Sequence, residues 1–195
     1  MNFAGEHDRQ EVAAIAARLI ADAGLDYRSA KARAARELFG NRAPRGAIPD
    51  NDEVDDALRE HLELFDDEHP ARVQRLRRVA LDLMEKLEQF RPFVTGAAWK
   101  GIAAEHAPVH LQLFHDNPKE VEYWLLDRKI AFDVDTIEHF HGRDDVEALM
   151  FEWQDEAVLL SLYDYDDLRG ALKAGPRGAQ RGDHDALQAR MQETR

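Results

Sequence analysis

The chain contains no cysteine, which excludes disulfide bonds and thiolate metal sites. Its only two serines, Ser29 and Ser161, stand in no motif of a serine nucleophile. No apolar run approaches the roughly 20 residues that a membrane-spanning helix needs, and the N-terminus lacks the basic and then apolar pattern of a signal peptide. These absences predict a soluble protein of the cytoplasm, without a membrane partner and without serine or cysteine nucleophile chemistry.

Basic residues are also scarce relative to acidic ones, 26 against 39, which gives a formal net charge of −13. Nucleic acids and anionic membranes bind clustered Lys and Arg, so this balance argues against both as general partners. The charge is uneven: the stretch 52–68 is mainly acidic, 72–78 is basic, and the tail after Leu172 is weakly basic. Such runs are typical of solvated helix faces, although a helix pair or a contact between copies of the chain would also explain them.

The length of 195 residues allows one domain with a sizeable core and a small helical appendage. In the first half of the chain, apolar residues recur at the spacing of amphipathic helices. Glycines follow the first two of these stretches, and Pro70 stands near the first turn of the last, where proline is tolerated. The predicted helices cover residues 6–23, 29–39, about 51–65 and about 70–90.

After Pro92 the apolar spacing changes to two, as in β-strands. Val109, Leu111 and Leu113 alternate with His110 and Gln112, which predicts a strand with two unlike faces. Strands are predicted over 93–98, 109–114, 131–140, 146–153 and 158–163, with helices over 119–129 and 166–173.

These patterns together predict an α+β protein. An N-terminal helical portion (1–90) precedes a small mixed β-sheet with packed helices (91–174). The last segment, 175–195, has Gly, Pro and Arg early and little apolar content. It is therefore predicted to be a flexible tail, with at most a weak helix over 183–191.

The motif region is the stretch from 91 to 127. Residues 91–101 read Arg-Pro-Phe-Val-Thr-Gly-Ala-Ala-Trp-Lys-Gly, and 106–116 read His-Ala-Pro-Val-His-Leu-Gln-Leu-Phe-His-Asp. A strand, a Gly-small turn, a second strand and an amphipathic helix follow one another in this order. The region 84–167 thus resembles the core of the DNA polymerase β-type nucleotidyltransferase fold.

The similarity extends to one group of proteobacterial nucleotidyltransferase-like proteins whose activity is not settled. Its further matching residues are the Ala-rich stretches 16–27 and 30–36, together with elements of 95–114. Some members of the group carry a muramate–alanine ligase label. The residues of this chain give that label no support, because it contains no Gly-x-x-Gly-Lys-Thr phosphate loop.

The resemblance implies a metal site on the second strand, where the fold carries two carboxylates separated by one residue. Pro108 and His110 stand there in this chain, or His110 and Gln112 if the register shifts by two. Proline has no ligating side-chain atom, and an imidazole is a poor ligand for Mg²⁺, which prefers oxygen. The resemblance therefore implies a nucleotidyltransferase-like fold with a degenerate active site.

Nucleotidyl transfer requires two divalent ions about 3.5–4 Å apart, so Mg²⁺ would be the cofactor of an active protein. Asp133 and Asp135 also stand one residue apart on a predicted strand. Together with His110 they are the candidate catalytic or metal-binding residues. The alternative is that both aspartates belong to turns at a strand end.

The Gly-small turn suggests a phosphate-binding segment. Thr95, Gly96, Ala97 and Lys100 could offer backbone amides and a positive charge to a nucleotide or phosphometabolite. A simple packing turn would explain the same residues.

The histidines allow a separate metal hypothesis. His106, His110 and His115 lie in the motif region, while His139 and His141 share a face of a predicted strand. Clusters of His and Asp suit Zn²⁺ or a similar ion. No spacing here is diagnostic, and scattered surface histidines are the alternative.

Two functional classes follow. One is a catalytically silent nucleotidyltransferase-like protein that binds a nucleotide, a phosphometabolite, a protein partner or a second copy of itself. The other is an active transferase with non-standard metal ligands. The missing carboxylates favour the first class.

Overall fold

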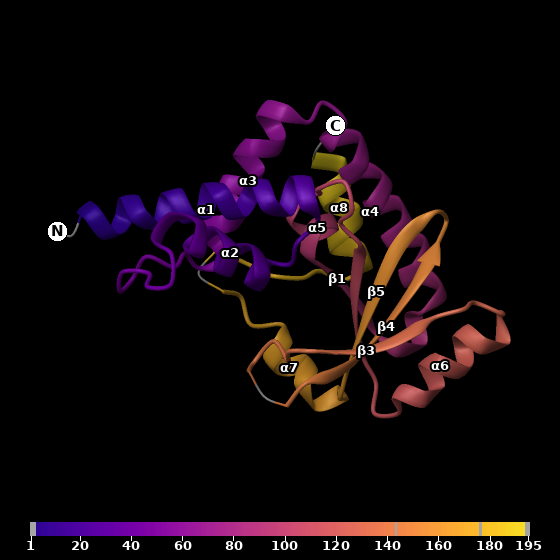
Figure 1. Cartoon of the computed structure of the whole chain (residues 1–195). Helices are drawn as coiled ribbons and strands as arrows, with labels where there is room; N and C mark the ends of the chain where they lie inside the picture. The colour runs from indigo at the N-terminus through magenta and orange to yellow at the C-terminus, as the bar shows by residue number, and fades with distance from the viewer. Residues whose placement is uncertain (1–2, 143, 176, 194–195) are drawn as a thin grey trace. The chain divides into compact units, whose positions relative to one another are not determined.

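The computed structural model describes residues 3–142, 144–175 and 177–193, and the described chain is an α+β protein with a mixed five-stranded sheet (Figure 1). The predicted class, helices followed by a mixed sheet with packed helices, is therefore confirmed. No described helix has both the length and the hydrophobicity that crossing a membrane requires. The helices are α1 (Phe3–Ala23), α2 (Tyr27–Phe39), α3 (Asn51–Phe65), α4 (His69–Lys86), α5 (Gly96–Lys100), α6 (Pro118–Asp127), α7 (Leu168–Ala171) and α8 (His184–Glu193), with short 3₁₀ turns η1 (Glu88–Phe90) and η2 (Tyr165–Asp167). The strands are β1 (Pro92–Thr95), β2 (Val109–Phe114), β3 (Asp133–Ile137), β4 (Val146–Trp153) and β5 (Glu156–Tyr163).

The chain forms two compact units. The first contains residues 1–72 and 102–107, and the second contains 73–101 and 108–195, as far as these are described. The sequence-based domain limits at 90 and 174 stay predictions.

The first unit has a core built from α1, α2 and α3. Fully buried alanines, such as Ala16 on α1 and Ala34 on α2, allow the helix backbones to approach closely. α3 contributes larger side chains and begins with a capping box, in which Asp50 and Glu53 each accept a hydrogen bond from the other's backbone N–H. The core residues are Val12, Ala16, Leu19, Ile20, Ala30, Ala34, Val54, Leu58, Leu62, Ile102 and Ala104.

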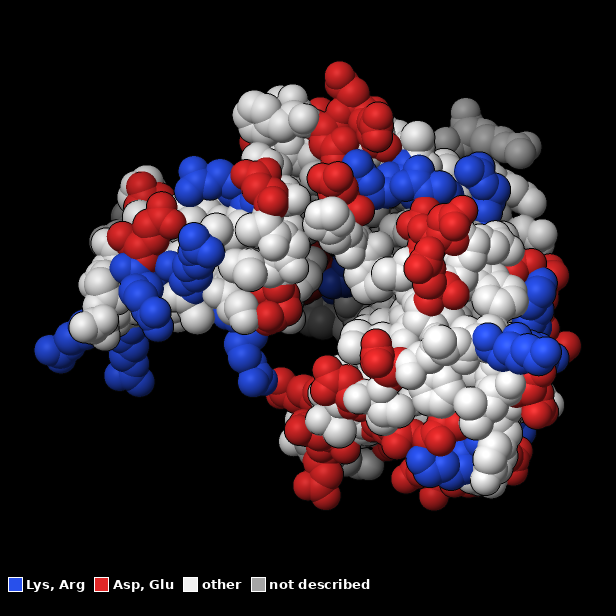
Figure 2. All heavy atoms as spheres, turned by 45° about the vertical axis from the view of Figure 1, so that its right-hand side comes forward, with Lys and Arg blue, Asp and Glu red and all other residues white. Residues whose placement is uncertain are grey.

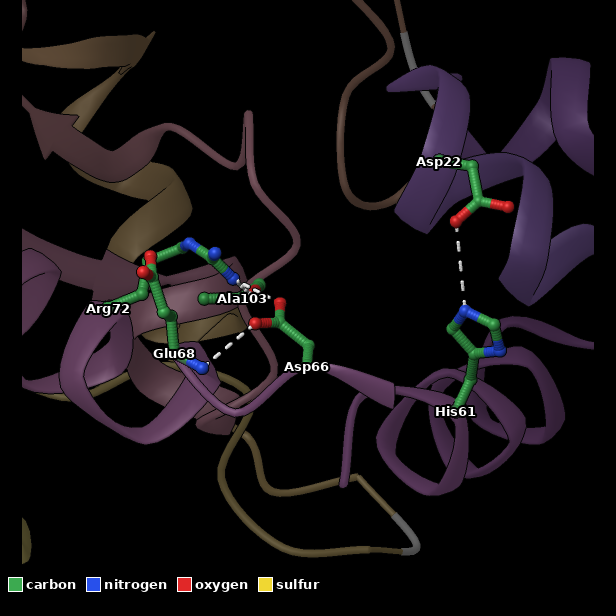
Figure 3. Close-up of polar contacts among 6 residues, drawn as sticks. All are labelled: Asp22, His61, Asp66, Glu68, Arg72 and Ala103. Carbon is green, nitrogen blue, oxygen red and sulfur yellow. Dashed lines mark hydrogen bonds and ion pairs between the residues drawn. The ribbon is translucent and has the colours of Figure 1, made fainter. Parts of the chain in front are cut away.

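A buried arginine holds the segment 102–107 in the first unit (Figure 3). Arg72 donates hydrogen bonds to Asp66 Oδ2 at 2.6 Å and to the Ala103 carbonyl oxygen at 3.1 Å. Asp66 Oδ1 also accepts from the Glu68 backbone N–H at 3.1 Å. The hydrogen bond from Arg72 is the main reason why the pKa of Asp66 lies below its usual value.

The sheet of the second unit has the strand order β1-β2-β5-β4-β3. β2 and β5 are parallel, and the other three neighbouring pairs are antiparallel. The prediction that 109–114 is an inner strand beside the strand containing 93–95 is confirmed, with Thr95 opposite His110. The predicted helix over 119–129 is also present, as α6.

The two faces of this sheet differ in polarity. Residues opposite each other in neighbouring strands point to the same face, so the strand register shows on which face each side chain lies. One face carries the fully buried Val109, Leu111 and Leu160. α4 and α6 cover it: Asp82 of α4 accepts a hydrogen bond from the indole of Trp153, and the Trp124 ring of α6 lies 6.4 Å from the Trp153 ring.

The opposite face, called the polar face below, carries a row of polar side chains across its two central strands. They are His110 and Gln112 on β2 and Ser161 on β5. Gln112 and Ser161 are buried, although both lie in otherwise apolar strands. By register, the candidate residues Thr95, His110, Asp133 and Asp135 lie on this face.

The predicted strand 93–98 is wrong beyond Thr95, because residues 96–100 form the short helix α5. Gly96 has a φ of +60°, a left-handed conformation that favours glycine and ends the strand. The helix is then held by arginines: Arg77 donates to the Ala98 carbonyl oxygen at 2.9 Å, and Arg190 donates to that of Trp99 at 3.0 Å.

The C-terminal segment also differs from its prediction as a flexible tail. Gly182 pairs with Val94 at the edge of β1 through two backbone hydrogen bonds of 2.9 and 3.0 Å. The Trp99 indole donates to the Ala179 carbonyl oxygen at 2.8 Å, and Leu187 of α8 is fully buried. Few apolar residues are needed here, because backbone pairing and one tryptophan fix the segment. Pro176, Thr194 and Arg195 of the predicted tail lie outside the described residues.

We expect Gly182→Ala to destabilise the second unit by about 1–3 kcal/mol, because its methyl group would overlap the buried Trp99 ring. Urea unfolding followed by tryptophan fluorescence measures the change in the free energy of unfolding. Gly175→Ala is the matched control, since the nearest neighbour of a Cβ there would be Gln180 Nε2, at 3.4 Å. Equal stability of the two variants would mean that the tail does not pack as described.

Candidate functional site

The candidate nucleotide-binding residues lie at the end of β1 and in α5. Thr95, Gly96 and Ala97 are half-buried, and Lys100 is partly exposed. The Thr95 hydroxyl donates a hydrogen bond to the Gln180 carbonyl oxygen at 2.9 Å. The Thr95 side chain, in the segment predicted to offer backbone amides to a phosphate, is thus bonded to the C-terminal segment.

His110, the candidate metal ligand, lies on β2 beside this turn. A Cβ at Gly96 would stand 3.5 Å from His110 Cβ, so the turn and the imidazole are in close contact. The Nε2 atom of His110 forms a hydrogen bond of 2.6 Å with the Ser161 hydroxyl. Burial, and secondarily the nearby Arg181 guanidinium, lower the pKa of His110 to about 4. The imidazole is therefore neutral near pH 7.

The polar face continues from this pair to Tyr163 and Arg181. Tyr163 is buried, and this burial raises the pKa of its phenol. Arg181 donates to the Ala171 carbonyl oxygen and lies with its guanidinium carbon 4.8 Å from the centre of the Phe140 ring. The cluster is a network of neutral hydrogen-bonding groups with one cation, and it contains no carboxylate.

The His110–Ser161 pair has the geometry of a nucleophile and its base, but not the accessibility. Ser161 is 0% exposed, so no substrate carbonyl or phosphorus atom reaches its Oγ. The hydrogen bond instead satisfies a hydroxyl buried between apolar neighbours on β5. We therefore interpret the pair as structural.

The other two candidate metal ligands, Asp133 and Asp135, lie on the opposite edge of the sheet. They belong to β3 and are exposed. The register places Asp133 in one row with Met150, Leu159 and His110. Asp133 and His110 stand at the two ends of this row, three strand spacings or about 14 Å apart. The structure does not bring His110 together with either aspartate, so the three residues cannot form one metal site.

His139 and His141 do not share a strand face, because β3 ends at Ile137 and both follow it in a loop. His139 Nδ1 accepts a hydrogen bond from the His141 backbone N–H at 3.0 Å, so its proton lies on Nε2, which faces Asp167 Oδ2 at 3.2 Å. Both ring nitrogens are thus engaged within the protein. In the described parts of the chain, no group of three or more His, Asp or Glu side chains could hold a metal ion.

One cavity of the second unit, of about 490 Å³, opens near β1 and the start of α8. Its lining includes the apolar Met84, Phe93 and Leu168, together with Arg91 and His184. Four acidic residues outnumber these two basic ones and disfavour a nucleotide phosphate through charge repulsion. The acidic residues are Glu85, Glu88, Asp183 and Asp185.

Sequence reasoning selected His110 and the Gly96 turn but missed Ser161, Tyr163 and Arg181. Ser161 follows His110 by 51 residues, and only the parallel pairing of β2 with β5 brings the two together. A signal was present, because Ser161 is the one polar residue between four apolar ones in the stretch 158–162. Arg181 lay in the segment that was expected to be disordered.

The chain matches no protein-family model and no curated protein. The interpretation of this site therefore depends on its own geometry and chemistry.

We expect His110 to make folding stability depend on pH. Its pKa in the folded state, about 4, lies below the ordinary value of 6.5, so the unfolded state binds more protons between these values. The contribution is complete above about pH 6.5 and is lost as the pH falls towards 4, by up to about 3 kcal/mol. Urea unfolding at pH 7.5 and 4.5 measures this loss.

The control for this pH dependence is His110→Gln, which keeps a hydrogen-bonding side chain but cannot gain a proton in this range. Its stability should fall less steeply between the two pH values than that of the unchanged protein. An equally steep fall in the variant would show that other groups account for the pH dependence, such as His69, whose pKa is also lowered by burial.

Proposed function

We propose that this chain is a nucleotidyltransferase-fold protein that has lost catalysis and serves as a non-enzymatic binding protein. The observation that carries the proposal is the neutral, partly buried His110–Ser161 pair at the position of the metal-binding carboxylates expected from the resemblance. Without carboxylates beside His110, this position lacks the ligands for the divalent ions that would neutralise the charge of a transferred phosphoryl group.

The order of elements around this pair supports the fold assignment. β1 leads into Gly96, the helix α5 and Gly101, and the chain then returns as β2, antiparallel to β1. Gly96 and Gly101 both have positive φ, +60° and +70°. This is the sequence of strand, Gly-small turn and strand from which the resemblance was inferred.

The C-terminal segment supports the loss of catalysis independently. Residues 179–182 form hydrogen bonds with Thr95, Trp99 and Val94. The segment thus occupies the end of β1, where a nucleotide phosphate would approach the turn. The contact uses two backbone hydrogen bonds between Gly182, which is buried, and Val94.

Transfer activity is the direct test. We expect incubation with labelled ATP, CTP, GTP or UTP and either Mg²⁺ or Mn²⁺ to leave RNA, protein and small-molecule acceptors unlabelled above a blank without protein. Asp133→Asn and Asp135→Asn serve as companion variants. Robust transfer that disappears in either variant would overturn the proposal and place an active site on β3.

A second candidate function is the binding of a nucleotide or phosphometabolite near residues 95–100. It is favoured by Arg181, a cation on the same face as His110 and Tyr163. The ligand would have to displace the bonds of the C-terminal segment, which predicts weak binding.

Thermal unfolding with and without ATP tests this second candidate. With a dissociation constant near 1 mM, 10 mM ATP would stabilise the folded state by only about 1.4 kcal/mol. Stabilisation by ATP that is lost in Arg181→Gln would support this function, with Arg169→Gln as a control that removes the same charge from an exposed site. No stabilisation at 10 mM would exclude it.

A further inference from the structure

The first unit contains a concentration of positive charge that the total net charge conceals. Between Asp26 and Pro49 the chain has six basic residues and two acidic ones, in a protein whose net charge is −13. We call these six residues the α2 basic surface. They are Arg28, Lys31, Arg33 and Arg36 on α2, and Arg42 and Arg45 in the loop that follows it.

The α2 basic surface is open to solvent. All of its members are exposed except Lys31, which is partly exposed and donates to Asn51 Oδ1 at 2.8 Å. Figure 2 shows basic side chains projecting at the left of the view, from the part of the molecule that contains α1 and α2. Within the described chain, no carboxylate lies within ion-pair distance of Arg33, Arg36, Arg42 or Arg45. These four guanidinium groups are therefore available to an external anion.

The chemistry of this surface favours phosphate. Five of its six cations are arginines, whose planar guanidinium donates two parallel hydrogen bonds to a phosphate. Arg33 and Arg36 are neighbours on one face of the helix, about 5–6 Å apart at their Cβ atoms. The 13 residues of α2 span about 20 Å, the axial length of about six phosphates of one nucleic-acid strand.

The packing of α2 disfavours a lipid surface. A membrane-bound amphipathic helix inserts its apolar face between lipids, but the apolar face of α2 packs inside the protein. Ala30, Ala34 and Ala35 are all buried in the core of the first unit. Only the charged face remains for an external partner.

We propose that the α2 basic surface binds the sugar–phosphate backbone of a nucleic acid. The contact is electrostatic and independent of base sequence, because phosphate contacts carry no sequence information. The acidic remainder of the chain opposes it, so the affinity is micromolar and strongly dependent on salt. The proposal does not depend on the fate of the nucleotidyltransferase site.

Fluorescence anisotropy of a labelled 20-nucleotide single-stranded RNA, titrated with the full chain at 50 and 200 mM KCl, tests the proposal. Each phosphate neutralised on a single strand contributes about −0.7 to the slope of log affinity against log salt. Contacts from the four unpaired arginines predict a slope of about −3. Saturable binding that weakens by this amount is the expected result.

Two matched variants decide whether the α2 basic surface is the site. Arg33→Gln with Arg36→Gln removes two charges from it, and Arg59→Gln with Arg78→Gln removes two from exposed positions on α3 and α4. We expect at least fivefold weaker binding in the first variant and less than twofold in the second. Substitutions at such surface positions change stability by about 0.5 kcal/mol or less, which circular dichroism can verify.

Three outcomes would overturn the proposal. One is the absence of saturable binding at 50 mM KCl, and another is an equal loss of affinity in both variants. The third is binding to phosphatidylserine vesicles or to polyglutamate that is as tight as binding to RNA and is lost in the α2 variant. That result would assign the surface to a lipid or protein partner.

Discussion

One interaction, the hydrogen bond between His110 and Ser161, sets the chemistry at the centre of the polar face. It joins the two parallel central strands and leaves both partners neutral, since burial keeps the imidazole unprotonated. A carboxylate at either position would carry a charge whose desolvation costs several kcal/mol without a bound cation. The neutral pair therefore allows this face to be covered by the protein's own chain.

Beside this pair, the C-terminal segment lies against the end of β1, where it contacts Thr95 and Trp99 and pairs through Gly182. The neutral His110–Ser161 pair and the contact of the C-terminal segment with β1 are consistent with each other. A sheet face that binds metal ions has to stay accessible to them, whereas a face of neutral side chains can pack against other parts of the chain.

The first unit shows why net charge is a poor guide to partners. Several of its carboxylates accept hydrogen bonds within the unit, as in the Asp66–Arg72 pair and the Asp50–Glu53 capping box. The arginines on α2 and in the following loop are exposed to solvent. Electrostatic binding responds to the local arrangement of charge within about one Debye length, about 8 Å in physiological salt. A strongly acidic chain can therefore present a locally cationic surface.

The sequence by itself determined the elements whose residues repeat over several turns or pairs: α1, α3 and α4, and the strand 109–114 with its unlike faces. It did not determine α5, because Gly96 to Lys100 is too short for periodicity and its helix is held by Arg77 and Arg190. Only the tertiary structure decided that His110 meets Ser161 rather than Asp133, since strand order, not spacing in the chain, sets which side chains share a site. The conformation of the C-terminal segment was likewise decided by tertiary contacts. It is ordered by backbone pairing to β1, and backbone hydrogen bonds require no hydrophobic pattern in the segment's own sequence.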